Sequence, residues 1–191
     1  MISSEQGGDM GQPFRRDRAR LPAAERRKQI VEVTSRLIAE YGFWGLSMQD
    51  VADGCGLTVP GLLHHVGSKE GLLIAVLDER DKSDMSELKA EKLQDLCAAL
   101  VRRNARQPEI VRLFAVLEAE SLAPDHPVHD YFRTREKRAI DSFTELAGGD
   151  EALARQVIAM MDGLQIQWLR NPVKVDLVKA WDDAADRLFS K

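Results

Sequence analysis

Apolar residues recur every three or four positions through most of the chain, with polar residues between them. This spacing gathers apolar side chains on one face of an α-helix, whereas a half-buried strand needs strict alternation, of which the chain has no convincing run. No uninterrupted apolar stretch is longer than six residues, the length of Leu72–Leu77, and a membrane-spanning helix needs about 18 or more. The pattern therefore predicts an all-α fold without a membrane span.

Proline and glycine mark the ends of the first predicted helix. Pro22 suits a first helical turn because its ring fixes a helical φ angle, and Gly42 ends the helix after Tyr41. One face of this helix is apolar and is expected to meet the core. It comprises Ile30, Thr34, Leu37, Ile38 and Tyr41.

Two short helices are predicted next, separated by a glycine-containing turn. Ser47 and Asp50 have the spacing of a capping box and begin the first of them. The glycines within residues 53–56 interrupt it, and Thr58 can cap the second, which ends at Gly67. Two short helices joined in this way, after a longer helix, are typical of a helix-turn-helix unit with its supporting helix.

The remaining chain is also predicted to be helical, giving about nine helices in all. A fourth helix starts at residues 68–70 and runs to about Met85. Three parts follow: a flexible basic arm (1–20), a three-helix helix-turn-helix domain (21–70) and a C-terminal helical bundle (71–191). Later helices are predicted at Glu87–Arg106, Pro108–Leu122, Val128–Ala147, Asp150–Arg170 and Val173–Phe189.

The third predicted helix divides into two faces when its residues are projected at the helical period. Val59, Leu62 and Val66 fall on the side expected to pack inward. The other side is where a recognition helix meets DNA. It comprises Pro60, Gly61, Leu63, His64 and Gly67.

The distribution of charge supports a division into a basic and an acidic part. The whole chain has a formal net charge of -4, yet Pro13–Arg36 carries eight bases and three acids. A basic end on an acidic body suits a DNA-binding module fused to another domain; a solvated helix face with a flexible arm is the alternative. Four arginines of the arm could enter a minor groove or hold phosphates, or form a plain tail. They are Arg15, Arg16, Arg18 and Arg20.

The stretch RRKQIVEVTSRLIAEYGFWGLSMQDVADGCGLTVPGLLHHVGSKEGLLIAVL, about residues 26–77, closely resembles the TetR-type transcriptional repressors. A later stretch, MMDGLQIQWLRNPVKVDL, is more loosely similar to one subgroup with small-molecule-responsive C-terminal domains. The resemblance implies a homodimeric DNA-binding transcriptional regulator, a repressor that a small-molecule effector releases from a palindromic operator. A helical ligand-binding or protein-interaction module with weakened DNA binding is the alternative.

The same resemblance implies particular DNA contacts. Ser47 is expected to contact a phosphate, Thr58 and Gly61 to lie close to DNA, and Lys69 to clamp a phosphate, with Gln49 a further exposed candidate. Ser47 and Thr58 could instead serve only as helix caps, and Lys69 could be a solvated residue of a first turn.

Two positions depart from the family's pattern, which has Tyr where this chain has Leu63 and Phe where it has Val66. Leu63 cannot donate a hydrogen bond to a phosphate, although it could pack on a thymine methyl group. His64 or His65 could replace that donor in part. Modest base readout is expected, with phosphate contacts and DNA shape supplying much of the affinity.

Apolar residues of the body suggest a cavity and a dimer interface. An unidentified effector is expected among Phe114, Leu117, Tyr131, Phe143, Met160, Met161 and Leu164, for each of which ordinary core is the alternative. The last two helices are expected to pair across a twofold axis, with burial inside one chain as the competing account. The interface residues predicted there are Gly163, Trp168, Leu177, Trp181 and Leu188.

Other chemistry is not indicated. His126 and His129 lack a third ligand at a diagnostic spacing, so no metal is expected, nor a cofactor or an enzymatic activity. Cys55 and Cys97 are expected to be small buried residues. The polar start of the chain has no apolar core of a secretion signal, so a cytoplasmic protein is expected. Its expected partners are double-stranded operator DNA, a second copy and the effector, and no membrane.

Overall fold

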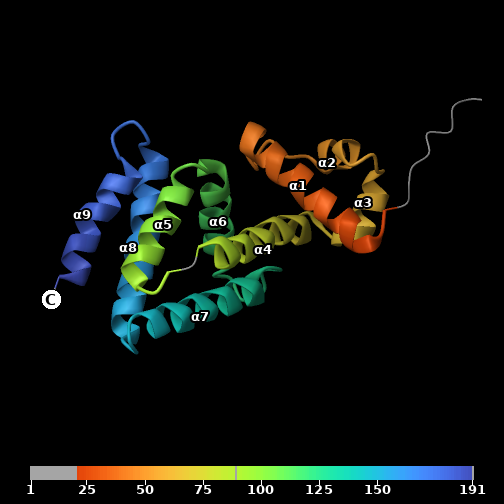
Figure 1. Ribbon diagram of the computed structural model, residues 1–191. Helices are drawn as coiled ribbons and strands as arrows, with labels where there is room; N and C mark the ends of the chain where they lie inside the picture. The colour runs from red at the N-terminus through yellow and green to blue at the C-terminus, as the bar shows by residue number, and fades with distance from the viewer. Residues whose placement is uncertain (1–20, 89, 191) are drawn as a thin grey trace, which may run out of the picture.

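The computed structural model describes residues 21–88 and 90–190, which form nine α-helices and no strand. The all-α prediction is therefore confirmed. Helices α1–α3, the head, lie at one end, and α4 leads from them toward α5–α9, the body (Figure 1). The basic arm predicted for residues 1–20 lies outside the described residues. The helices are α1 (Ala23–Tyr41), α2 (Met48–Gly54), α3 (Val59–Val66), α4 (Lys69–Glu87), α5 (Leu93–Asn104), α6 (Pro108–Glu120), α7 (His129–Leu146), α8 (Glu151–Arg170) and α9 (Leu177–Phe189).

Helix α1 follows its predicted boundaries. Pro22 precedes it, and Gly42 ends it with a positive φ of 71° while its N–H donates to the Ile38 carbonyl at 2.9 Å. Ile30 and Ile38 are fully buried, as expected from their spacing. Tyr41 was expected on the same face and is instead 63% exposed. It is the last residue of the helix, where the chain already turns away from the core.

The junction between α3 and α4 depends on two glycines. Gly67 has a φ of 78°, which L side chains rarely adopt, and its N–H donates to the Leu63 carbonyl at 2.7 Å. Gly71, in the first turn of α4, lies so close to α3 that an added Cβ would be 2.3 Å from the Val66 carbonyl oxygen. A side chain at residue 71 would therefore push the two helices apart.

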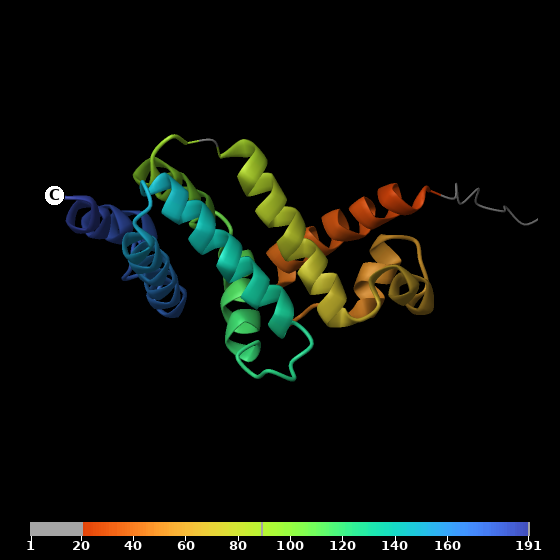
Figure 2. The same cartoon turned by 90° about the horizontal axis from the view of Figure 1, so that it is seen from below.

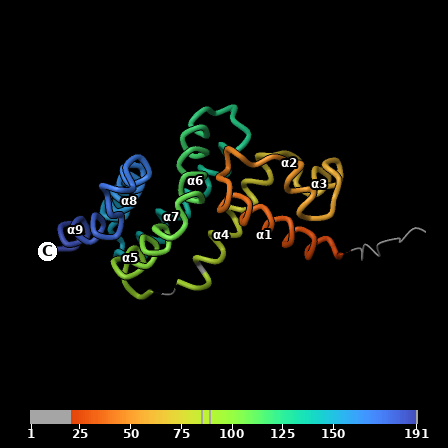
Figure 3. Tube along the Cα trace, turned by 90° about the horizontal axis from the view of Figure 1, so that it is seen from above, coloured from red at the N-terminus to blue at the C-terminus, as the bar shows by residue number. Residues whose placement is uncertain are grey.

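Two later boundaries differ from the sequence prediction. A helix was expected to begin at Glu87, but α4 continues to that residue, Leu88 leaves helical geometry, and α5 begins at Leu93. Figure 3 shows α4 and α5 as two separate helices. The last helix begins at Leu177 rather than Val173, because the chain first turns after Asn171 and Asp176 then caps α9 by accepting from the Lys179 N–H at 3.0 Å.

The apolar interior is divided into two cores. The first core unites the head, the first half of α4, and parts of α6 and α7; the second unites α5, α8 and α9 with single residues of α6 and α7. Leu62 of α3 and Leu72 of α4 are fully buried in the first core, and Trp181 of α9 is 1% exposed in the second. In Figure 2, α7 runs alongside α4 toward the second core. Helices α3 and α4 thus pack on one shared core.

Three predicted interface residues belong to the second core instead. Trp168, Leu177 and Trp181 are buried within this chain, so the expectation that they face a partner was wrong. The helical period correctly placed them on one side of their helices, but α9 packs that side against α5 and α8 of the same chain. The third tryptophan, Trp44, lies just after α1 and is 72% exposed.

Both cysteines are buried, as expected. Burial raises the pKa of the Cys97 thiol to about 12, so this thiol stays protonated at neutral pH. None of the helices in the described ranges has the length and the apolar character that crossing a membrane would require.

Replacing Trp181 by Phe tests whether this side chain is core. We expect a loss of about 1–3 kcal/mol in the free energy of unfolding, because the smaller ring leaves a cavity. Urea denaturation gives the stability, and sedimentation should show an unchanged oligomeric state. A variant that dissociates while keeping its stability would return Trp181 to the interface.

Candidate nucleic-acid interface and interior polar network

The helix-turn-helix unit is held by the two predicted caps. Ser47 Oγ accepts from the Asp50 N–H at 3.1 Å, and Thr58 Oγ1 accepts from the Gly61 N–H at 3.2 Å. The Ser47 hydroxyl also donates to the Asp50 carboxylate at 2.5 Å, so two hydrogen bonds join these residues. Both capping residues are exposed, and each can meet a ligand as well as end a helix.

The two faces of α3 follow the projection from sequence. Leu62 is fully buried, and Val59 and Val66 pack against the first core. On the opposite side Pro60 and His64 are exposed. The remaining candidates on this helix, Gly61, Leu63 and His65, are partly exposed. The exposed face offers few side-chain donors.

Lys69 makes a contact that sequence reasoning missed. Its Nζ donates to the Leu46 carbonyl at 2.9 Å, across 23 positions of sequence. This bond brings the Lys69 ammonium group beside the residue that precedes Ser47. An ammonium group has three N–H donors, so two are left for other acceptors. The two predicted phosphate contacts are thus brought to the same region of the head.

Two further polar side chains stabilise the head. Gln49 is exposed, but its Nε2 donates to the Asp53 carboxylate at 2.8 Å, along α2. Arg26 of α1 donates through Nη1 to the Cys55 carbonyl at 3.2 Å. The basic stretch of the sequence included Arg26, but nothing in that stretch predicted a bond to the turn after α2.

The head matches a known family model. The description "Bacterial regulatory proteins, tetR family" applies to residues 30–76, which include α2, α3 and the start of α4. This match places the head in the TetR family of transcriptional regulators. DNA binding through a helix-turn-helix follows from that membership.

Two curated relatives extend the similarity beyond the head. The regulator BetI of Rhizobium meliloti (strain 1021) is 29% identical over 157 residues, covering 74% of this chain and 77% of the relative. The repressor KstR2 of Mycobacterium tuberculosis is 27% identical over 171 residues, covering 85% and 78%. Both are HTH-type transcriptional regulators rather than enzymes.

Solved structures share the whole fold. A TetR-family regulator from Rhodococcus sp. has a TM-score of 0.66 at 21% identity, covering 87% of this chain and 100% of that one. The TetR-family repressor FadR of Thermus thermophilus, solved with lauroyl-CoA, has a TM-score of 0.57 at 18% identity, covering 85% and 92%. The nine-helix arrangement is therefore that of TetR-family regulators.

The residues predicted to line a ligand cavity are divided between the two cores. Phe114, Leu117 and Tyr131 belong to the first core, whereas Phe143, Met161 and Leu164 belong to the second. Met160 is 38% exposed on the outer side of α8, so its assignment to the interior was wrong. Helical spacing does not distinguish two cores within one domain.

Polar side chains join elements of the two cores. We call this set the interior polar network. It comprises Arg80, Asp81 and Asp84 of α4, Arg103 and Asn104 of α5, Glu118 of α6, Tyr131 and Arg135 of α7, and Asp162 and Gln165 of α8.

Arg135 connects α7 to α4 within this network. Its Nε donates to the Asp81 carboxylate at 2.8 Å, and its guanidinium lies 4.3 Å from the centre of the Phe114 ring. Tyr131, one turn earlier on α7, has a buried hydroxyl group without a hydrogen-bond partner. Burial raises the pKa of that phenol above its ordinary value. The interior therefore retains a polar group that a ligand or water can satisfy.

Two carboxyl groups of the network have raised pKa values. Burial, with a smaller contribution from Glu118, raises the pKa of Asp162 to about 6, and burial likewise raises the pKa of Glu118. In the folded state Asp162 therefore keeps its proton up to about pH 6, whereas in the unfolded chain it loses that proton at about pH 4. The free energy of unfolding should fall as pH rises from about 4 to about 6.

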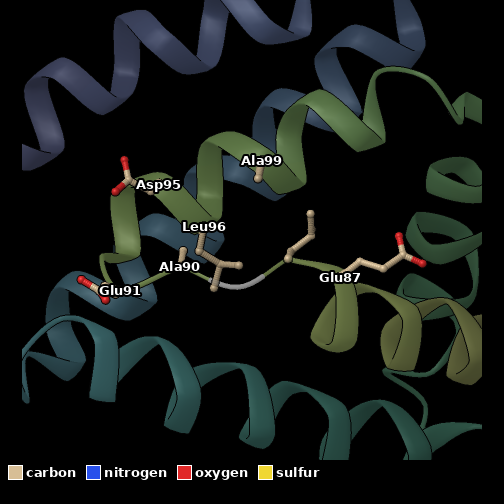
Figure 4. Close-up of a pocket in the computed structure, with 7 residues that line it drawn as sticks. Glu87, Ala90, Glu91, Asp95, Leu96 and Ala99 are labelled. Atoms are coloured by element: carbon tan, nitrogen blue, oxygen red, sulfur yellow. The ribbon is translucent and has the colours of Figure 1, made fainter.

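The histidine pair and two surface hollows are the alternative candidate sites. His129 Nδ1 lies 2.7 Å from the Ser121 carbonyl, and His126 Nε2 lies 4.0 Å from Glu120. Among the described residues no group of three His, Cys, Asp or Glu could hold a metal ion. A hollow between the ends of α4 and α5 has acidic side chains, and Figure 4 shows Glu87 and Asp95 at opposite sides of it.

A second hollow follows the outer face of α8 and includes two predicted interface residues. Gly163 and Leu188 line it, and at Gly163 nothing lies within 4 Å of an added Cβ. Ile166, also on α8, is 41% exposed. The other lining residues are Gln156, Ala159, Met160, Leu164 and Gln167.

Replacing Asp162 by Asn should remove most of the pH dependence between pH 4 and 6. We expect a free energy of unfolding about 2 kcal/mol above wild type at pH 7.5, because the variant buries no carboxylate. Urea denaturation at several pH values measures this. Asp141→Asn, at an exposed position on α7 paired with Lys137, is the control and should keep the wild-type slope. Equal slopes in wild type and Asp162→Asn would contradict the assignment.

Proposed function

We propose that this TetR-family chain is a homodimeric transcriptional repressor that binds a palindromic operator and leaves it when a small molecule binds in the body. The observation that carries the proposal is the head itself: α3 presents an exposed face while Ser47 and Lys69 lie in one region beside it. The relative KstR2 is described as a repressor, which favours repression over activation.

In the proposed complex, phosphate contacts supply most of the affinity. Ser47 and Lys69 bind backbone phosphates, while Thr58 and Gly61 allow close approach at the start of α3. Leu63, His64 and His65 face the major groove, with Gln49 at its edge. Because Leu63 offers only apolar contact, base readout is modest and DNA shape contributes to specificity.

Leu63 and Val66 also favour a second candidate function, a helical ligand-binding or protein-interaction module with weakened DNA binding. The family's Tyr and Phe are replaced at these two positions, and Leu63 cannot donate to a phosphate. Operator binding separates the two functions.

Dimerisation is proposed through the outer face of α8. Glycine in a helix interior costs about 1 kcal/mol relative to alanine, and no neighbour within this chain requires a glycine at residue 163. A partner helix approaching closely would require it. Leu188 and the exposed Met160 and Ile166 then gain apolar contacts across the twofold axis.

Effector control is proposed to act through α4. This helix begins at Lys69, beside the proposed phosphate contacts, and continues without interruption to Glu87. Its second half is tied to the body by ion pairs and hydrogen bonds of the interior polar network. A ligand that changes these bonds moves α4, and α4 in turn moves helix α3 of the head. FadR was solved with lauroyl-CoA, which supports a ligand-binding body in this fold.

Operator binding should be strongly salt-dependent. If each subunit neutralises about four phosphates, the dimer's log-log slope of affinity against salt is about -7. Lys69→Ala should reduce the slope by about two for the dimer and weaken all sequences alike. Lys82→Ala, an exposed lysine of the same helix paired with Asp78, is the control. DNA from the promoter nearest the gene is the probe, measured by fluorescence anisotropy. Absence of salt-dependent binding would favour the second candidate function.

Introducing Arg at Gly163 should separate the dimer. A long charged side chain cannot be buried between two closely packed helices. Sedimentation should show monomer, and operator affinity should fall because two half-sites about one helical turn apart need both heads held together. Lys179→Arg, at an exposed position on α9, serves as the control. A Gly163→Arg protein that remains fully dimeric would place the interface elsewhere.

A further inference from the structure

Arg80 is the least satisfied charged side chain among the residues that the structure describes. The residue is 9% exposed, and its Nη2 donates to Asn104 Oδ1 at 2.7 Å. Its Nε and Nη1 are also buried, and neither has a hydrogen-bond acceptor. Buried polar groups in proteins are nearly always hydrogen-bonded, and guanidinium donors are expensive to leave unmatched. Arg80 therefore has unused capacity to bind an acceptor.

The acidic residue nearest Arg80 is shared with a second arginine. Asp84 lies between two guanidinium groups: its carboxylate is 2.5 Å from Arg103 Nη1 and 3.3 Å from Arg80 Nε, and neither ion pair has hydrogen-bond geometry. Arg103 has further partners in Ser83 and Glu87. The nearby Asp81 is already bound by Arg135. Arg80 and Arg103 thus share the buried carboxylate of Asp84.

A chain of hydrogen bonds from α5 and α8 fixes the position of the Arg80 guanidinium. Asn104, which accepts its hydrogen bond, donates through Nδ2 to Gln165 Oε1 at 2.9 Å. Gln165 in turn donates to the Met161 carbonyl at 3.0 Å. This chain of bonds links α4 through α5 to α8. The guanidinium is therefore held in place before any ligand arrives, which reduces the entropy lost on binding.

We propose that Arg80 anchors an oxyanion, a carboxylate or phosphate group of the effector. The inference rests on the proposed function, because it assigns a chemical class to the effector proposed there. The anion accepts from the unmatched Nη1 and Nε donors, a pairing for which guanidinium groups are well suited. The anion also competes with Asp84 for Arg80. Both residues lie on α4, so binding changes the contacts of the helix that leads to the head.

Thermal unfolding of the full-length chain without DNA tests the site. The probes are sodium acetate and sodium phosphate, titrated against sodium chloride at constant ionic strength. We expect a saturable rise in Tm with at least one oxyanion, and the better probe identifies carboxylate or phosphate as the preferred group. Arg80→Gln should weaken that binding about tenfold or more. Any general salting effect appears equally in wild type and variant.

Three further variants sharpen the result. Asp84→Asn should tighten oxyanion binding about tenfold, because it removes the competing negative charge. Arg102→Gln, at an exposed position on α5, and Lys179→Gln, at an exposed position on α9, should bind as wild type does. The gain in affinity keeps the test decisive even if Arg80→Gln folds poorly.

Three outcomes would overturn the proposal: no saturable rise in the wild type, an unchanged rise in Arg80→Gln, or no tightening in Asp84→Asn. Operator binding is measured separately on the same proteins. Salt-dependent operator binding without an oxyanion effect refutes the site alone. An oxyanion effect without operator binding refutes the proposed repressor alone.

Discussion

The close approach of α4 to α3 at Gly71 is the constraint on which the arrangement of the head depends. Only hydrogen at this position lets the first turn of α4 lie against the Val66 carbonyl. That contact fixes the angle between α3 and α4 at the Gly67 turn. It also brings Lys69 within reach of the Leu46 carbonyl. The exposed face of α3 is therefore positioned by α4, and a displacement of α4 cannot leave it unchanged.

The body holds α4 differently at its two ends. Near the head, α4 is seated by buried leucines in the first core. Farther along, polar side chains join it to α5, α7 and α8. Apolar packing is insensitive to small changes in charge, whereas hydrogen bonds and ion pairs in a low-dielectric interior depend strongly on which partners are present. The helix is thus firmly seated at one end and responsive to chemistry at the other.

Local features of the fold could be predicted from sequence, and contacts between distant segments could not. Ser47, Thr58 and Gly42 mark helix ends through interactions within one turn, so their positions were confirmed. The outer and inner faces of α3 follow from its period alone. By contrast, periodicity shows that Trp181 lies on an apolar face but not whether that face meets this chain or another. The Lys69 bond and the Arg80 network join residues far apart in sequence, and no local pattern announces them.

The three tryptophans divide the protein spectroscopically. Trp44 is solvent-exposed in the head, while Trp168 and Trp181 are buried together in the second core of the body. Indole emission shifts to longer wavelength in water, so the head contributes the red edge of the intrinsic fluorescence and the body its blue edge. Iodide or acrylamide in solution would quench Trp44 first. Without any added label, the two ends of the molecule therefore report on their surroundings through separate parts of one spectrum.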